Sequence, residues 1–214
     1  IYGMTYSIEE KKENISKGKL PLLVLPLPGI FNVYNSLCAY VIAKELEIPN
    51  EIILKGIKAC KIRGRCEWVP VSDKFRVLLD YAHNALSLES LLTTLLDYKP
   101  KRLVCLFGCG GDRSKERRFE MGEVSGRLAG LTILTSDNPR NEEAESIISD
   151  IEKGIKRTKG LYIKNVDRRE AIKYAISNAL EGDLIVIAGK GHETYQEIKN
   201  VKYHMDDREL ILES

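Results

Sequence analysis

Short apolar runs alternate with longer amphipathic stretches over residues 66–214 of this chain. The apolar runs lie at 75–79, 103–107, 131–135 and 184–188, and each has the length of a buried strand. The stretches between them repeat apolar side chains at spacings of three and four residues, which predicts helices. Because strands that alternate with helices build parallel sheets, we expect a Rossmann-like, doubly wound α/β domain with a mostly parallel sheet.

Three of the intervening stretches have well-defined apolar faces. Their apolar side chains are, in chain order, Leu88, Leu91, Leu92, Leu95 and Leu96; then Ile147, Ile148, Ile151 and Ile155; then Ala171, Ile172, Ala175, Ile176, Ala179 and Leu180. Each set is expected to line one side of a helix that packs on the sheet.

Residues 1–65 follow a different pattern and are expected to belong to another domain. The lysine- and glutamate-rich segment at 9–13 predicts a solvated surface, and the apolar run at 22–25 predicts a strand. The N-terminus has no initiator Met at position 1 and no signal-peptide layout, so we interpret it as a cut end.

Helical spacing covers residues 31–47 and 50–60, and Pro49 is suited to start the second helix. The alternating pattern begins only after Arg63-Gly64-Arg65. We therefore place the domain boundary at residue 65.

Composition excludes several classes of protein. The formal net charge is only +2 and no long basic block is present, so nucleic acid is not an expected partner. The longest apolar runs, such as 184–188, are too short to span a membrane. The five cysteines are odd in number and contain no CxxC pair, which argues against disulfides and zinc. We expect reduced, mostly buried thiols and a cytoplasmic protein.

The tetrapeptide Asp137-Asn138-Pro139-Arg140 follows the apolar run at 131–135. It therefore falls at the carboxyl end of a strand, where open α/β sheets bind ligands. An acid, an amide and a guanidinium beside a backbone-restricting proline would form a clamp for a substrate with both ammonium and carboxylate groups. The alternative is a plain turn in which the acid or the amide caps the next helix.

Polar residues also follow two other predicted strands. In the DYAHN segment, Asp80 and His83 could hold a ribose hydroxyl and a base edge; alternatively Asn84 caps a helix and His83 is a surface residue. The glycine-rich segment at 108–113 could bring backbone amides to a ligand, with charges at its rim, or could form only a tight turn.

A fourth loop, AGKGHE at 188–193, follows the last strong strand. Its Glu193 could pair with a substrate ammonium, whereas the alternative is an exposed turn with solvated charges. Ahead of the α/β domain, Asn32 and Asn35 lie three residues apart at a helix start and should face the same way. Asn32 could be an N-terminal cap, which leaves the Asn35 amide to read an adenine edge.

These segments together resemble one family closely. GxFNVxN, GRxE, DYAHN, FGCGGDR, SDNPRNEE, AGKGHE and DDRE occur in this order in Mur ligases, from about Pro26 to Glu209. In that family DNPR marks the members that add meso-diaminopimelate. The resemblance implies that residues 66–214 are the C-terminal domain of a Mur ligase and residues 1–65 the end of its central, ATP-binding domain.

The resemblance also implies roles for individual residues. The expected substrate-binding residues are Arg113, Asp137, Asn138, Pro139, Arg140, Gly189 and Glu193. The expected ATP-binding residues are Asn35, Arg65, Asp80 and His83. The family's GTNGKT phosphate loop and its carbamylated lysine with metal-binding acids are absent from the sequence, so no catalytic residue or metal ligand is assigned and the chain alone is expected to be inactive.

The reaction implied for the whole enzyme uses ATP and Mg²⁺ to activate the D-glutamate carboxylate of a UDP-N-acetylmuramoyl dipeptide as an acyl phosphate. The amine of meso-diaminopimelate then attacks, which forms an amide in peptidoglycan synthesis and releases phosphate. The domains must close to assemble this site, so Gly64 and its neighbours are hinge candidates. A monomer is expected. Two alternatives stay open: a related ligase that adds lysine or extends glutamate chains, and a binding module without catalytic activity.

Overall fold

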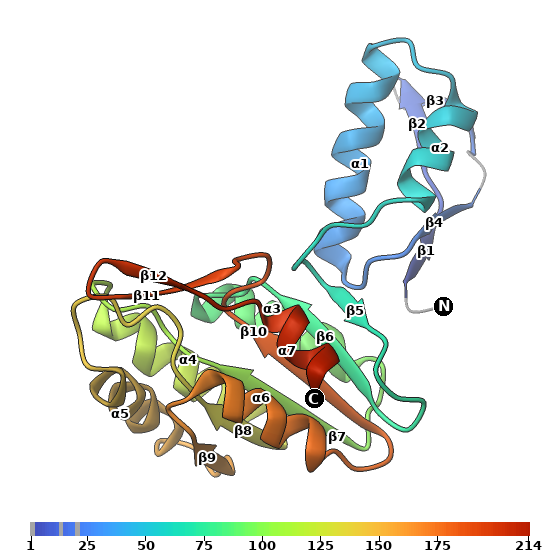
Figure 1. Cartoon of the computed structure of the whole chain (residues 1–214). Helices are drawn as coiled ribbons and strands as arrows, with labels where there is room; N and C mark the ends of the chain where they lie inside the picture. Colours follow the sequence, from blue (N-terminus) through green and yellow to red (C-terminus); the bar gives the residue numbers. More distant parts are fainter. Residues whose placement is uncertain (1–2, 13–14, 20–21) are drawn as a thin grey trace. The chain divides into compact units, whose positions relative to one another are not determined.

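The computed structural model describes residues 3–12, 15–19 and 22–214 (Figure 1). The chain divides into two compact units, Ile1–Ile62 and Arg63–Ser214. Each unit has its own hydrophobic core and is described by itself.

The first unit combines short antiparallel strand pairs with two helices. Its elements are β1 (Met4–Tyr6), β2 (Glu9–Lys12), β3 (Ile15–Lys19), β4 (Leu23–Leu25), α1 (Ile30–Glu45) and α2 (Asn50–Lys58). β1 pairs with β4, and β2 pairs with β3. β4 confirms the strand expected at 22–25, whereas the side chains of the expected solvated segment 9–13 lie outside the described residues.

The start of α1 differs from the expectation. Gly29 is the N-cap, and Asn32 lies one turn inside the helix, where its Nδ2 donates to the Pro28 carbonyl at 2.8 Å. The proposed cap at Asn32 is therefore wrong. Asn35 Nδ2 donates to Asn32 Oδ1 at 3.3 Å, so the two amides do share a helix face, and Asn35 is exposed.

The second unit is built on a six-stranded sheet in the order β5-β6-β10-β7-β8-β9. Its strands are β5 (Glu67–Val69), β6 (Arg76–Asp80), β7 (Arg102–Phe107), β8 (Leu131–Leu134), β9 (Tyr162–Lys164) and β10 (Asp183–Ala188). Its helices are α3 (Ala85–Leu96), α4 (Lys115–Leu128), α5 (Ala144–Ile155), α6 (Arg168–Ser177) and α7 (Asp207–Glu213). All neighbouring strands run parallel except β5, which is antiparallel to β6. The expected doubly wound α/β fold is confirmed.

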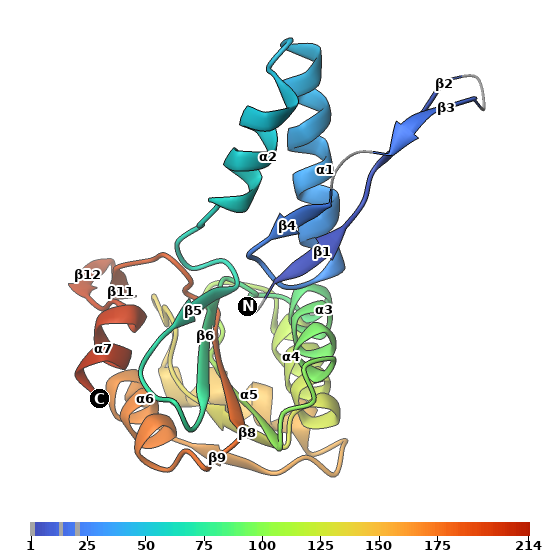
Figure 2. The same cartoon turned by 90° about the vertical axis from the view of Figure 1, so that its right-hand side faces the viewer.

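The handedness of the connections places the helices. From β6 through β7 and β8 to β9 the chain moves in one direction across the sheet, so right-handed crossovers put α3, α4 and α5 on one face. The chain then turns back to β10, which places α6 on the other face. Figure 2 shows α6 and α7 on one side of the sheet and α3, α4 and α5 on the opposite side.

Apolar side chains fill the space between the sheet and the helices. On the α6 face, alternate strand residues meet the helix side chains predicted from the sequence, because successive strand side chains point to opposite faces. This core contains Val69, Val77, Leu79, Val104, Leu106, Ile133, Ala171, Ile172, Ala175, Ile176, Ile185, Ile187, Leu210 and Ile211.

Two residues assigned to apolar helix faces are exceptions. Leu96, at the end of α3, is 39% exposed. Leu180 is 59% exposed because α6 ends at Ser177, so this leucine lies in the following loop. No helix in the described part of the chain is long and apolar enough to cross a bilayer.

The strand order brings the four polar loops together. β6, β10, β7 and β8 are consecutive neighbours and parallel, so their carboxyl ends share one edge of the sheet. The DYAHN, AGKGHE, glycine-rich and DNPR loops follow these strands in that order along the edge.

Candidate functional site

The DNPR loop does not cap a helix. The N-cap of α5 is Glu143, which makes no side-chain capping bond, so the capping alternative for Asp137 and Asn138 is wrong. The loop instead contacts the glycine-rich loop, because the backbone N–H of Gly111 donates to the Asn138 carbonyl at 2.9 Å.

Asn138 joins three segments. Its Oδ1 accepts from the Lys190 ammonium at 3.2 Å and from the backbone N–H of Glu197 at 2.9 Å. Its Nδ2 donates to Glu193 Oε2 at 2.9 Å. Asn138 is only 4% exposed, so both ends of its amide are used within the protein.

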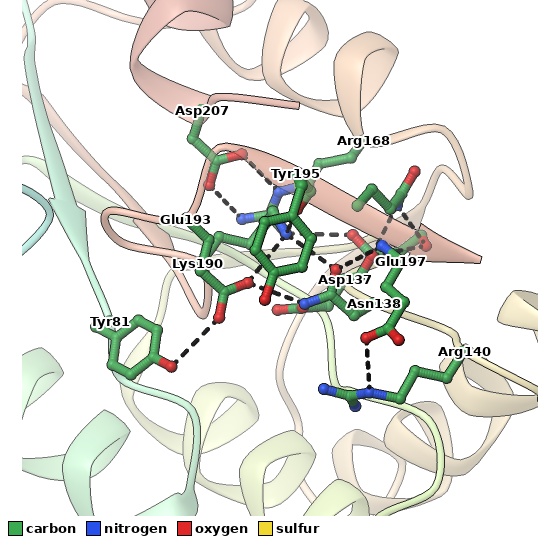
Figure 3. Close-up of polar contacts among 12 residues, drawn as sticks. Tyr81, Asp137, Asn138, Arg140, Arg168, Lys190, Glu193, Tyr195, Glu197 and Asp207 are labelled. Atoms are coloured by element: carbon green, nitrogen blue, oxygen red, sulfur yellow. Dashed lines mark hydrogen bonds and ion pairs between the residues drawn. The ribbon is translucent and has the colours of Figure 1, made fainter. Parts of the chain in front are cut away.

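Lys190 is a buried cation at the centre of this cluster (Figure 3). Its side chain is 0% exposed, and the ammonium donates to Asn138, to Glu193 Oε2 at 3.3 Å and to the Tyr195 carbonyl. An ammonium has three N–H donors, so these partners satisfy it. The alternative of an exposed turn with solvated charges is therefore wrong for this loop.

Glu193 is the second charged member of the cluster. Besides Lys190 and Asn138, it accepts from the Tyr81 hydroxyl at 3.2 Å. Burial and the Glu193 carboxylate together raise the pKa of Tyr81, which keeps the phenol protonated as a donor. The side chain of Glu193 is 19% exposed, so the carboxylate remains accessible from the sheet edge.

Asp137 differs from its neighbours. It is 7% exposed, and none of the residues that the structure describes donates a hydrogen bond to its carboxylate. Burial raises its pKa, while the charges of Lys190 and Arg168 oppose that rise. A Cβ on Gly189 would lie 2.7 Å from Asp137 Oδ2, and Gly189 has φ +107°, so only glycine fits beside this carboxylate. Asp137 is thus a nearly buried acid with spare hydrogen-bonding capacity.

Arg140 lies at the far end of the loop with φ 51°. Its Nε donates to Glu197 Oε2 at 3.2 Å and its Nη1 donates to the Gly111 carbonyl at 2.8 Å. No acceptor for Nη2 is found within the described residues. The side chain is 22% exposed, so part of the guanidinium faces solvent.

Arg113 is not drawn into the cluster. It is exposed, and its only described hydrogen bond goes to the carbonyl of the adjacent Asp112 at 3.2 Å. The structure brings together Asp137, Asn138, Arg140, Gly189 and Glu193 but leaves Arg113 at the rim.

The DYAHN loop supplies a neighbouring group. Asp80 Oδ1 accepts from the backbone N–H of Ala82 and Oδ2 from that of Cys66, both at 2.8 Å, so Asp80 orders the loop. His83 is exposed, with Nδ1 2.8 Å from the Tyr81 carbonyl. Asn84 caps α3 through reciprocal bonds with Ser87, which confirms the capping alternative for this residue.

Tyr81 connects the DYAHN loop to the charged cluster. The guanidinium carbon of Arg65 lies 4.5 Å from its ring centroid, and the ring centroid of His83 lies 4.8 Å away. A small group of side chains, formed by Arg65, Tyr81 and His83, therefore lies beside Glu193 at the DYAHN loop. The remaining residue expected at the nucleotide, Asn35, belongs to the first unit.

Gly64 lies close to the boundary of the two units, within the second unit. Its N–H donates to Glu67 Oε2 at 2.7 Å, and a Cβ there would lie 2.1 Å from the Gly191 carbonyl carbon. Gly64 is therefore closely packed within the second unit, and the hinge at Gly64 and its neighbours stays a prediction.

Sequence reasoning missed several residues that support the site. β11 (Tyr195–Ile198) and β12 (Val201–His204) form a hairpin beside the DNPR loop. Its two-residue turn, Lys199-Asn200, has positive φ at both positions, a conformation that asparagine favours. The asparagine at position 200, between two short segments of alternating residues, could therefore have indicated the hairpin.

A buried ion pair fixes the strand ends from the other face. Arg168 Nε and Nη2 donate to Asp207 at 2.8 and 2.6 Å, and both side chains are 0% exposed. The same guanidinium donates to the carbonyls of Ser136 at 3.2 Å and Ala188 at 3.1 Å. No local sequence pattern indicates this pair, because its members are far apart in the chain.

Comparisons with known proteins agree with the fold and with the resemblance. The family model described as "Mur ligase, glutamate ligase domain" matches residues 64–191, more than half of the chain. The UDP-N-acetylmuramoyl-L-alanyl-D-glutamate--2,6-diaminopimelate ligase of Caldanaerobacter subterraneus subsp. tengcongensis is 44% identical over 206 residues. That match covers 96% of this chain and 41% of the relative, so the chain spans about two fifths of that protein.

Solved structures give the same result. A UDP-N-acetylmuramoyl-L-alanyl-D-glutamate--2,6-diaminopimelate ligase aligns with a TM-score of 0.67 at 37% identity, over 91% of this chain and 41% of that one. A Mycobacterium tuberculosis folylpolyglutamate synthase, solved with ADP and AMPPCP, shares the fold with a TM-score of 0.62 at 20% identity, over 80% of this chain and 40% of that one. The chain belongs to the Mur ligase family.

Proposed function

We propose that the chain is part of an ATP-dependent ligase that joins meso-diaminopimelate to UDP-N-acetylmuramoyl-L-Ala-D-Glu. The observation that carries the proposal is the charge arrangement on the DNPR loop. Asp137 is a nearly buried carboxylate without a described hydrogen-bond donor, and Arg140 has an unused Nη2. This combination suits a ligand end that carries both an ammonium and a carboxylate.

The cluster suggests how the roles divide. Asp137 and the accessible side of Glu193 would accept hydrogen bonds from the substrate ammonium, and Arg140 would donate to its carboxylate. Asn138, Pro139 and Gly189 would act mainly by shaping the loop, because the Asn138 amide is already used by Lys190, Glu193 and Glu197. Arg113 would bind only if its exposed side chain turns toward the substrate.

The same proposal assigns ATP to Arg65, Asp80 and His83 of the second unit and to Asn35 of the first unit. A carboxylate oxygen accepts more than one hydrogen bond, so Asp80 can hold its loop and still receive a ribose hydroxyl. The exposed His83 and Arg65 offer a ring and a planar cation for contact with an adenine.

The proposed chemistry forms an acyl phosphate between the D-glutamate carboxylate and the γ-phosphoryl group of ATP, with release of ADP. The free amine of meso-diaminopimelate attacks the acyl carbon, phosphate leaves, and the amine loses a proton. Orientation of the two substrates lowers the entropic part of the barrier. The described residues include no group of three or more His, Cys, Asp or Glu that could hold a metal, so no ligand is assigned to Mg²⁺ and no step is derived through it.

The proposal is tested on the intact enzyme with meso-diaminopimelate and with lysine, which lacks the distal carboxylate. Arg140→Ala should lower the preference for meso-diaminopimelate by roughly 10- to 150-fold, because one charge-assisted contact is worth about 1.5–3 kcal/mol. Arg140→Lys should restore little, since an ammonium cannot reproduce the guanidinium fork. An unchanged preference would contradict the proposed contact between Arg140 and the substrate carboxylate.

The same assay separates the competing functions. Phosphate release that depends on lysine or on a glutamate chain would favour a related ligase. No nucleotide-dependent amide formation at all would favour a binding module.

We further propose that the protein is cytoplasmic, in keeping with its five free cysteines, and that it is a monomer. Size-exclusion chromatography of the intact enzyme tests the monomer.

A further inference from the structure

The β11–β12 hairpin holds the DNPR loop from one side. The Gln196 amide donates to the Asp137 carbonyl at 2.7 Å, and the Glu197 N–H donates to Asn138 Oδ1 at 2.9 Å. The Arg140 N–H donates to the Glu197 carbonyl at 3.0 Å. The hairpin therefore contacts the loop at three of its four residues, and Glu197 takes part twice through its backbone.

The side chain of Glu197 makes a further contact with the same loop. Its Oε2 accepts from Arg140 Nε at 3.2 Å, and both side chains are between one fifth and one quarter exposed, at 23% and 22%. Figure 3 shows the Glu197 carboxylate pointing toward Arg140, at the opposite end of the cluster from Tyr81.

This contact leaves a defined part of the guanidinium available. Nε is used by Glu197, and one Nη1 hydrogen is used by the Gly111 carbonyl at 2.8 Å. A guanidinium has five N–H donors, so the second Nη1 hydrogen and both Nη2 hydrogens remain. These donors suffice for a two-point contact with a carboxylate.

We propose that Glu197 is a positioning residue that sets the amino-acid specificity of the site by orienting Arg140. An unrestrained arginine side chain has many rotamers, and fixing it on substrate binding costs conformational entropy. Glu197 fixes the guanidinium beforehand and directs its free donors at the substrate carboxylate. The inference rests on the proposed function, because it concerns the carboxylate that distinguishes meso-diaminopimelate from lysine.

The kinetic test uses the intact enzyme with Glu197→Ala and Glu197→Gln. Glu197→Ala should raise KM for meso-diaminopimelate about 10-fold, with kcat and KM for lysine within about 2-fold of wild type, because the loss falls on one oriented contact. Glu197→Gln should stay within about 3-fold of wild type, since the amide oxygen still accepts from Nε.

Glu143→Ala is the matched control. Glu143 is also an acid near the DNPR loop, but its side chain is 78% exposed, and the one ion pair that it makes within the described residues, with Lys199, is 3.9 Å long. This variant should change neither KM. The positioning role would be overturned if Glu197→Ala raised KM equally for both amino acids, or if it raised KM for neither.

A second measurement does not depend on the reaction. In the ¹⁵N-labelled 214-residue chain, the Arg140 Nε–H resonance, identified by its loss in Arg140→Lys, should report an ordered side chain. Glu197→Ala should make it mobile and Glu197→Gln should not. If the resonance is equally ordered in Glu197→Ala, the inference fails. If the resonance responds but meso-diaminopimelate is no substrate, the proposed function fails instead.

Discussion

Asp137 illustrates at the level of one residue how a candidate binding residue can lower the stability of the folded state. Its carboxylate is nearly buried, and no described residue donates a hydrogen bond to it, so the charged form is poorly compensated. An acid in this position is costly to the folded state unless a ligand supplies the missing donors.

Asp137→Asn should therefore stabilise the chain at neutral pH by about 0.5–2 kcal/mol, while the intact enzyme loses amino-acid affinity. Because burial raises the folded-state pKa of Asp137 above its ordinary 3.8, wild-type stability declines as pH rises from that value through the folded pKa. The variant should therefore be more stable than wild type once the pH exceeds the folded-state pKa of Asp137. Below pH 3.8 the two proteins should have the same stability. Urea unfolding at several pH values measures it, and a variant less stable than wild type at neutral pH contradicts it.

Lys190 differs from Asp137 because all three N–H groups of its buried ammonium donate hydrogen bonds within the protein. Lys190→Met should lower the free energy of unfolding by about 3–5 kcal/mol, because Glu193 and Asp137 would remain as acids without their buried cation. Lys199→Met, at a side chain that is 75% exposed, should change stability by less than about 0.5 kcal/mol. Urea unfolding at neutral pH compares the two variants. Equal effects would show that burial of Lys190 does not matter.

At the scale of elements, an ion pair joins α4 to the DNPR region. Arg118 Nη1 and Nη2 donate to Glu142 at 2.8 and 2.6 Å, and Glu142 Oε1 also accepts from the backbone N–H of Asp112 at 2.6 Å. Arg118 is 1% exposed and lies in α4, so this helix anchors both the glycine-rich loop and the start of the segment that leads into α5.

The Arg118 hydrogen bonds lower the pKa of Glu142 from 4.5 to about 2. A depressed pKa stabilises the folded state above pH 4.5, and the contribution is lost as pH falls from 4.5 toward 2. Glu142→Gln should therefore flatten the loss of stability in this acid range, whereas Glu143→Gln should leave it unchanged. Urea midpoints at pH 7, 5 and 3 test this, and parallel curves for wild type and Glu142→Gln contradict it.

The long elements could be predicted from sequence, because their periodicity is a local property. The four buried parallel strands and the apolar faces of α3, α5 and α6 followed from spacing alone. β5 and β9 have three residues each, too few to show a period, and their strand pairing depends on neighbours in space. α4 was missed because it buries Arg118, Gly122, Ser125 and Gly126 instead of a leucine stripe.

The gathering of the polar loops at one edge of the sheet could be predicted for a related reason. The polar loops were visible because each directly follows a strand, and a parallel sheet brings strand ends together. The sequence did not reveal which of these side chains already make all their hydrogen bonds within the protein. The Asn138 side chain hydrogen-bonds to residues 52 or more positions away, and Lys190 donates to Asn138, to the Tyr195 carbonyl and to Glu193. Glu197 belongs to a hairpin without a strong apolar pattern.

For the whole molecule, the prediction is that the 214-residue chain does not perform the ligation alone. The chain matches 41% of the length of its relative, and its sequence contains no GTNGKT phosphate loop. The purified chain should release no phosphate from ATP that depends on the UDP-linked dipeptide, while the intact enzyme serves as positive control. Dipeptide-dependent phosphate release by the chain would contradict this.

The position of β10 has a consequence for synthesis on the ribosome. β10 is the last parallel strand to be made, at residues 183–188, yet it lies between β6 and β7, which end at Asp80 and Phe107. Until residues 183–188 leave the exit tunnel, β6 and β7 have no strand between them and each presents an unpaired edge. The nascent chain therefore cannot complete its sheet before β10 has been made, and until then the free edges of β6 and β7 are open to pairing with other chains.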